Sequence, residues 1–204
     1  MPTTTFFNLP SEKREKFLRC ARAEFARVPF VDTSVNRIIR AAGIPRGSFY
    51  QYFRDKEELF RFLLGQLGGN LIAVVEDLLD RRAGDLFAAL ADLFDRVQAE
   101  YGNPAARPVF EDVIEIARKN PDLGKTLFSP EETQSCAFQR LCGRVDGSLL
   151  DLRSDRDLED ILRILAGVAG PAIVNGILSD NSAEVRRTYL NSLDLLSRGM
   201  AHKK

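Results

Sequence analysis

Residues 33–59 of this chain read TSVNRIIRAAGIPRGSFYQYFRDKEEL, and they decide the fold of its N-terminal part. Their first third predicts a short helix over 34–42, with Thr33 as N-cap and apolar residues recurring every three or four positions. Gly43 follows, where we expect the chain to take a left-handed turn. The residues expected to face inward from this helix are Val35, Ile38, Ile39 and Ala42.

A second short helix is predicted from Pro45 to about Phe53. Proline suits a first helical turn because its missing N–H would be unpaired there anyway. At about 100° per residue, Phe49 and Phe53 lie on one side of this helix and hydrogen-bonding groups lie on the other. The aromatic run 49–53 also has strand propensity, but its flanks carry helix start and stop signals. Two short helices joined by a tight turn, behind a longer helix at 11–28, predict a helix-turn-helix.

The polar side of the second helix carries groups suited to reading DNA bases. Arg46 can donate two hydrogen bonds to guanine, and Gln51 can pair with adenine in the same way. Gly47 has no side chain, so the backbone can approach DNA closely. The alternative is that this is an ordinary helical bundle with aromatic core residues, because helix-turn-helix geometry also occurs without DNA binding.

The charge of the chain is unevenly distributed. The 204 residues include 29 Lys or Arg and 29 Asp or Glu, and the zero sum taken alone argues against a nucleic-acid partner. Residues 1–56, however, carry a net charge of +6, and residues 57–204 carry −6. A basic head on an acidic body indicates a polyanion partner for the head, although solvated charged helices would also explain it.

Composition excludes several other classes of protein. With 45% hydrophobic and 28% charged residues, the chain is typical of a soluble globular protein. No uncharged apolar run approaches the roughly 20 residues of a membrane span, so we expect no membrane partner and no secretory signal. Three scattered cysteines predict no disulfide framework, and they favour the reducing cytoplasm.

Catalytic chemistry has little support in the sequence. The single histidine, His202, leaves no basis for histidine acid/base catalysis or a His-rich metal site. No phosphate-binding glycine loop, nucleophile elbow or metal-ligand spacing is present. We therefore expect no catalytic residues, no metal and no cofactor.

The stretch 33–59 resembles the DNA-binding domain of the tetracycline-repressor (TetR) family. With the preceding helix, the resemblance covers about the first 60 residues. It implies a homodimeric transcriptional regulator that binds double-stranded operator DNA, usually a repressor released by a small-molecule effector. Family members commonly have Ser where this chain has Pro45, and often His where it has Gln51, so operator sequence is not predicted. The matching segments are Ala41-Ala42-Gly43-Ile44, Arg46-Gly47-Ser48-Phe49-Tyr50, Tyr52-Phe53 and Lys56-Glu57-Glu58-Leu59.

The resemblance also assigns the DNA-contact residues. Six of them fall on recognition-helix positions, and Thr33 and Lys56 fall on phosphate-contact positions. The complete set is Thr33, Arg46, Gly47, Ser48, Tyr50, Gln51, Tyr52 and Lys56.

The rest of the chain predicts further helices, so that the fold class is all-α with about nine helices. Two domains are expected: residues 1–56 for DNA binding, with the helix-turn-helix core at about 33–53, and residues 57–204 for effector binding and dimerisation. The additional helices are predicted at 55–82 with a break at Gly68 and Gly69, 85–101, 105–119, 130–149, 155–179 and 182–200.

Apolar stripes in the body provide effector candidates. They are typical of ordinary core, but the resemblance places an effector cavity among the middle helices. An apolar lining would suit a small apolar or aromatic effector. The candidates are Phe94, Tyr101, Phe110, Ile114, Phe128 and Phe138.

The apolar residues of 155–179 and 182–200 predict that the last two helices pack against each other. The resemblance implies that they form a four-helix dimer interface, which would set two recognition helices about 34 Å apart on a palindrome. The candidate interface residues are Leu158, Leu162, Leu165, Ile173, Val185, Tyr189, Leu193 and Leu196.

Two other functional classes remain open at this point. A helical small-molecule enzyme would need converging acid/base groups, and the sequence offers only scattered carboxylates and tyrosines. A protein-interaction scaffold with an architectural helix-turn-helix would not need the +6 head.

Overall fold

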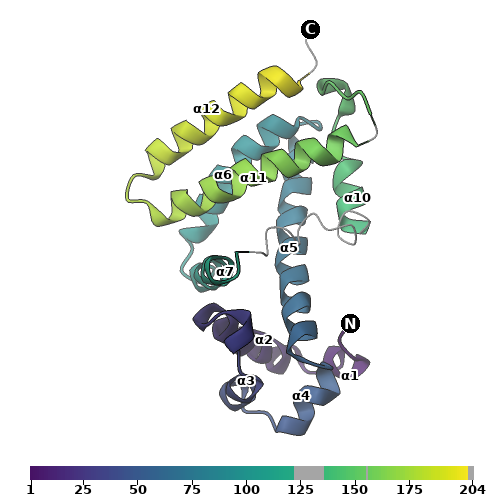
Figure 1. Cartoon of the computed structure of the whole chain (residues 1–204), viewed down its shortest axis with the longest axis vertical. Coiled ribbons are helices and arrows are strands. Elements are labelled where there is room, and N and C mark those ends of the chain that lie inside the picture. Colours follow the sequence, from purple (N-terminus) through teal and green to yellow (C-terminus); the bar gives the residue numbers. More distant parts are fainter. Residues whose placement is uncertain (122–135, 155, 202–204) are drawn as a thin grey trace. The chain divides into compact units, whose positions relative to one another are not determined.

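The computed structural model describes residues 1–121, 136–154 and 156–201. Every regular element within these residues is a helix, which confirms the predicted all-α class (Figure 1). An isolated bridge between Leu150 and Ala201 is the only β pairing in the described part of the chain.

The chain divides into two compact units. Among the described residues, the first comprises 1–69 and 108–121, and the second comprises 70–107, 136–154 and 156–201. Helix α5 (Lys56–Arg81) contributes residues to both units. This division differs from the predicted boundary at residue 56, because the start of α5 and most of α7 (Arg107–Lys119) pack with the N-terminal helices.

The first unit is built around an aromatic core. Its Phe6, Phe17, Phe25, Phe49 and Phe53 are at most 1% exposed. Such large apolar side chains account for most of the hydrophobic stabilisation of a small unit. The remaining elements of this unit are α1 (Thr4–Phe7), α2 (Ser11–Arg27), the 3-10 helix η1 (Phe30–Asp32), α3 (Val35–Ala42) and α4 (Arg46–Tyr52).

The second unit contains a layer of three long helices. Phe94 of α6 stacks on Tyr189 of α12 with ring centroids 5.5 Å apart. The buried Tyr189 hydroxyl donates to the carbonyl of Leu90 at 2.9 Å. Gly176 of α11 admits α6 closely, since a Cβ at this position would lie 2.6 Å from the Phe94 ring. The helices and turn are α6 (Leu86–Tyr101), α10 (Cys136–Cys142), η2 (Gly147–Leu149), α11 (Asp157–Leu178) and α12 (Ser182–Met200).

Two predicted features of the body are wrong. Helix α5 runs without a break through Gly68 and Gly69, because each glycine costs a helix only about 1 kcal/mol and buried residues anchor the helix further along on both sides, from Leu63 back and from Val75 onward. The helix predicted at 130–149 is described only as α10, which ends at Cys142 before a turn and η2. Residues 130–135 of that prediction lie outside the described part of the chain.

Candidate nucleic-acid interface

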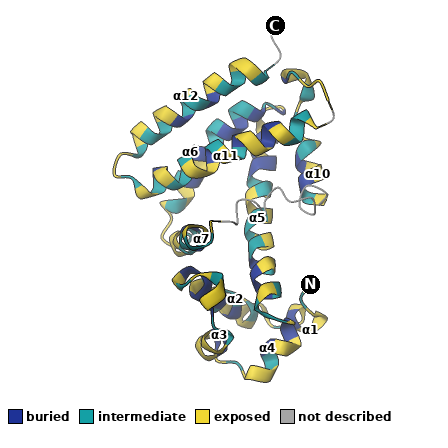
Figure 2. Cartoon of the chain, in the orientation of Figure 1, coloured by how far each residue is buried: buried dark blue, intermediate teal, exposed yellow. Residues whose placement is uncertain are grey.

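Helix α4 has two different faces, as predicted. Phe49, followed by Phe53 just after the helix, is fully buried, whereas Tyr50 is 53% exposed. Arg46, Gly47 and Gln51 are also exposed, and Ser48 is half-buried (Figure 2). The buried Phe49 and Phe53 thus fix one side of α4, and the other side presents hydrogen-bonding groups to solvent, as a recognition helix requires.

A left-handed glycine sets the angle between α3 and α4. Gly43 has φ of 72°, which confirms the predicted turn conformation. The N–H of Ile44 donates to the carbonyl of Ile39 at 3.0 Å and closes the end of α3. The ammonium of Lys16 on α2 lies 3.6 Å from the position that a Cβ would occupy at Gly43. A cation therefore stands beside the turn that leads into α4.

Three of the predicted DNA contacts have structural roles in this unit. Thr33 is buried, and its hydroxyl donates to the carbonyl of Pro29 at 3.3 Å rather than capping α3. Tyr52 is 8% exposed, and its ring packs in the aromatic core against Phe6 and Phe17. The ammonium of Lys56 donates to the carbonyls of Phe30, Val31 and Thr33 at 2.9, 2.9 and 3.4 Å. Because an ammonium has three donors, a phosphate would have to displace one of these carbonyls.

The positive charge of the head is partly neutralised within the unit. Arg27 and Arg37 pair with Glu24, and Arg54 pairs with Asp55. The side chains of five other cations form no ion pair or hydrogen bond with any described residue, and they remain available to phosphates. These five are Lys13, Lys16 and Arg19 on α2, and Arg40 and Arg46 on either side of the turn.

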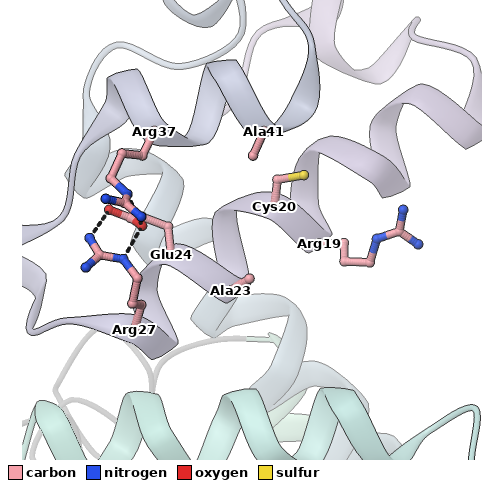
Figure 3. A pocket seen from close by; sticks show the side chains of 7 residues that line it. All are labelled: Arg19, Cys20, Ala23, Glu24, Arg27, Arg37 and Ala41. Carbon is pink, nitrogen blue, oxygen red and sulfur yellow. Dashed lines mark hydrogen bonds and ion pairs between the residues drawn. The ribbon is translucent and has the colours of Figure 1, made fainter.

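Glu24 joins α2 to the start of α3, a role that no sequence pattern indicated. Its carboxylate is 6% exposed and accepts two hydrogen bonds from Arg27, each 2.8 Å long. It also accepts from the backbone N–H of Ser34 at 3.2 Å, and the guanidinium of Arg37 lies 3.4 Å away. Figure 3 shows both arginines beside Glu24. These three residues line one end of a pocket of about 370 Å³.

The environment of Glu24 favours its ionised form. Hydrogen bonds from Arg27 lower the pKa of the Glu24 carboxyl below its ordinary value, and the Ser34 N–H and Arg37 add to this effect against the cost of burial. Because the pKa is lowered on folding, the stabilisation is present above the unfolded pKa of about 4.3 and is lost as the pH falls through the folded pKa.

Replacing Glu24 by Gln should therefore lower the free energy of unfolding by about 1–3 kcal/mol at pH 7, through loss of charge-assisted hydrogen bonds. The difference from the wild type should shrink as the pH falls from 5 to 3. Denaturant unfolding at several pH values measures both effects. Glu15→Gln, at an exposed position of the same helix, is the matched control. Parallel pH curves for the wild type and Glu24→Gln would contradict this role.

Helix α7 is distant in sequence from the helix-turn-helix but packs in the same unit. Lys119 donates to the carbonyl of Ala26 at 2.6 Å, and Asn120 accepts from the N–H of Phe30 at 3.0 Å. Arg22 and Asp112 form an ion pair of 2.9 Å, and Ile116 is 2% exposed in the aromatic core. The end of α2 and the loop before α3 are thus held by residues outside the first 60.

The predicted effector residues are divided between the two units. Phe94, Tyr101 and Phe138 belong to the second unit, while Phe110 and Ile114 belong to the first. Phe128 lies outside the described residues. Phe94 is 1% exposed and stacked on Tyr189, so in this structure it is a core residue.

Half of the predicted dimer residues are buried within the single chain. Leu162, Leu165, Tyr189 and Leu193 are 1–7% exposed, so within the single chain they are core residues, and their part in a dimer interface stays a prediction. Leu158, Ile173, Val185 and Leu196 are half-buried. The large apolar residues that α11 and α12 leave exposed are Ile164, Leu178 and Leu195, at 46%, 58% and 57% (Figure 2).

Comparisons with known proteins agree with this geometry. Residues 17–63 match the family model of the bacterial regulatory proteins, tetR family. The uncharacterized HTH-type transcriptional regulator YdgC of Bacillus subtilis (strain 168) is 35% identical over 68 residues, which are 33% of this chain and 35% of that protein. The match therefore spans about a third of the length of that curated relative.

Solved structures extend the similarity beyond the first unit. A TetR family transcriptional regulator from Chloroflexus aurantiacus J-10-FL is 29% identical with a TM-score of 0.52, and each chain is covered completely. A TetR-family regulator from Pectobacterium atrosepticum has a TM-score of 0.58 at 19% identity, over 96% of this chain and 99% of that one. The second likeness concerns the fold alone.

Proposed function

Because this chain belongs to the TetR family of transcriptional regulators, we propose that it is a cytoplasmic homodimeric repressor that binds a palindromic operator and is released by a small effector. Proteins of this family regulate transcription and are not enzymes, so the small-molecule enzyme is no longer an alternative. One observation carries the DNA-binding part of the proposal: α4 is exposed on its polar face and fixed by fully buried aromatic residues on the other.

Base reading is proposed for Arg46, Gln51 and Tyr50, which are exposed side chains of α4. Contacts to the DNA backbone are proposed for the other four cations without described partners, which are Lys13, Lys16, Arg19 and Arg40, together with the N-terminal turn of α3. This extends the phosphate-contact set beyond Thr33 and Lys56, whose polar groups are engaged within the unit. The acidic remainder of the chain would be repelled by phosphate, so only the head is expected to lie against DNA.

Selection from a random-sequence duplex library, followed by footprinting of the selected DNA, tests this function. We expect a palindrome with half-sites about one helical turn apart, bound much more tightly than a scrambled duplex at physiological salt. The affinity should fall steeply between two salt concentrations. Equal affinity for selected and scrambled DNA would exclude sequence-specific regulation and favour the protein-interaction scaffold.

Uncovered apolar surface on α11 supports the dimer. This helix is long and apolar enough to cross a membrane. Its most apolar 18-residue segment has a mean hydropathy of 1.8, yet only 28% of that segment is buried. Helix α5 is also long and apolar enough to cross a membrane, with a mean hydropathy of 1.4. Exposed Ile164 and Leu178 of α11, with Leu195 of α12, would be covered by the same helices of a second copy, as an isologous interface requires.

Replacing Ile164 by Glu is expected to weaken the dimer at least about 100-fold, because an unpaired charge buried in an interface costs several kcal/mol. Sedimentation equilibrium measures the dissociation constant. Leu149→Glu introduces the same charge at a leucine that is 38% exposed in η2 and should leave the dimer intact. An unchanged dimer in Ile164→Glu would remove this face of α11 from the interface, and partitioning of the wild type into lipid vesicles would argue for a membrane partner instead.

Effector release requires a connection between the body sequence and α4, and α7 is the proposed connection. Its residues hold the end of α2 through Lys119 and the loop before α3 through Asn120. A shift of α7 would therefore alter the support of the helix-turn-helix.

We propose an apolar or aromatic effector near Phe94, Tyr101 and Phe138, and a panel of small aromatic and aliphatic molecules in a DNA-release assay tests that class.

A further inference from the structure

Residues 3–7 form a connection to the recognition helix that the sequence did not indicate. The backbone N–H of Thr3 donates to the carbonyl of Tyr52 at 3.1 Å. The Thr3 hydroxyl donates to the carbonyl of Gln51 at 2.5 Å. Both acceptors are the last two residues of α4, and both donors come from one residue 48–49 positions earlier in the chain.

These hydrogen bonds matter because α4 is short. It has seven residues, so about half of its carbonyls lack a partner within the helix. A helix of two turns is not stable alone, and its end frays unless other parts of the protein hold it. Phe53 after the helix is extended, with φ of −135° and ψ of 139°, so the chain itself does not continue the turn. Thr3 supplies donors at the end that would otherwise be open.

A buried phenylalanine fixes Thr3 in place. Phe6 of α1 is 0% exposed. Its ring centroid lies 4.8 Å from that of Phe53, 5.5 Å from Phe62 and 6.0 Å from Tyr52. The N–H of Phe6 also donates to the Thr3 carbonyl at 3.1 Å, which makes one turn of helix between the anchor and the cap. Aromatic packing of this kind holds the Thr3 donors in one position before DNA binds, so little conformational entropy is lost on binding.

We propose that Thr3, anchored by Phe6, is a positioning residue for DNA reading: it fixes the backbone of Gln51 and Tyr52 and thereby the direction of the Gln51 side chain. This inference rests on the proposed function, in which Gln51 reads a base. Thr3 acts through α4 and contacts no base itself. Its removal therefore weakens discrimination between sequences more than it weakens general attraction to DNA.

The experiment uses the full chain and the palindrome selected by the wild type, with a scrambled duplex of equal length. Thr3→Val keeps the side-chain shape and removes the donor to Gln51, which should lower affinity for the palindrome about threefold to tenfold. Affinity for the scrambled duplex and its salt dependence should not change. Thr5→Val makes the same change at an exposed threonine of α1 and should behave as the wild type. Thr3→Ser, which restores the hydroxyl, should recover most of the affinity.

A double-mutant cycle separates positioning from general support. If Thr3 acts through Gln51, Thr3→Val should have little effect on palindrome affinity in a Gln51→Ala background. Equal losses in both backgrounds, or a wild-type affinity for Thr3→Val, would overturn the inference. A wild type that selects no sequence at all would instead overturn the proposed function, so the two failures are distinguishable.

Discussion

Arg46→Ala is expected to lower affinity for the selected palindrome at least tenfold while the protein stays folded and dimeric. Arg46 is exposed at the first position of α4, and it forms no ion pair with any described residue. An arginine that donates two hydrogen bonds to guanine contributes about 1–3 kcal/mol of discrimination per site, and a dimer would lose two such contacts. Affinity should fall mostly for the selected sequence, and the base preference at one position of each half-site should relax.

Lys16→Ala is the contrasting variant for this prediction. Lys16 stands beside the turn at Gly43 and is proposed to contact phosphate. Its loss should weaken binding to all duplexes to a similar extent and reduce the salt slope by about one per protomer. Titrations of both variants against selected and scrambled duplexes at several salt concentrations measure these effects. Normal palindrome affinity in Arg46→Ala would remove Arg46 from the DNA-contact set.

Gly84→Ala should destabilise the second unit severely, by about 3 kcal/mol or more. Gly84 has φ of 82°, a left-handed conformation that costs other residues about 1–2 kcal/mol. A Cβ there would also lie 2.6 Å from the backbone nitrogen of Asp146 and 3.0 Å from the carbonyl oxygen of Arg144. These are main-chain atoms, and the Asp146 N–H donates to the Gly84 carbonyl at 3.0 Å, so the loop cannot move away without losing that bond.

Thermal unfolding followed by helical circular dichroism measures the effect, and a decrease of about 10 °C in midpoint is expected for a chain of this size. Gly68→Ala is the matched control, because Gly68 lies within α5 and a Cβ there meets no atom within 4 Å. That substitution should raise stability by about 0.5–1 kcal/mol. Equal midpoints for Gly84→Ala and the wild type would show that the loop at Asp146 adapts freely.

Local sequence patterns were sufficient for much of the first unit. The spacing of Ile38, Ile39 and Ala42 predicted α3, and Gly43 predicted the left-handed turn that the structure contains. The separation of Phe49 and Phe53 from the exposed side chains of α4 was also predicted correctly. Each of these features depends on residues within about one or two helical turns of one another, where periodicity and capping chemistry operate.

Sequence spacing does not identify the partner of a helix face. Leu165 and Tyr189 have the spacing of a helix face, but spacing does not distinguish a face that packs inside the chain from one that meets a second copy. The structure buries both within the single chain and leaves Ile164 and Leu178 exposed, while the predicted dimer contacts stay a prediction. The break predicted at Gly68 and Gly69 is absent for a related reason: the low helix propensity of two glycines costs less than the packing of α5 around Leu63 and Val75 contributes.

By itself, the sequence determined that this protein is all-helical, that its basic charge lies in the first 56 residues, and that a helix-turn-helix presents Arg46 and Gln51 on one face. Only the tertiary structure decided which groups hold that helix. Thr3 reaches Gln51 across 48 residues, and Lys119 reaches Ala26 across 93. The physical reason is that helices form from contacts three and four residues apart, whereas a cap or an anchor from elsewhere exists only once the chain has packed and brought a donor within 3 Å of its acceptor.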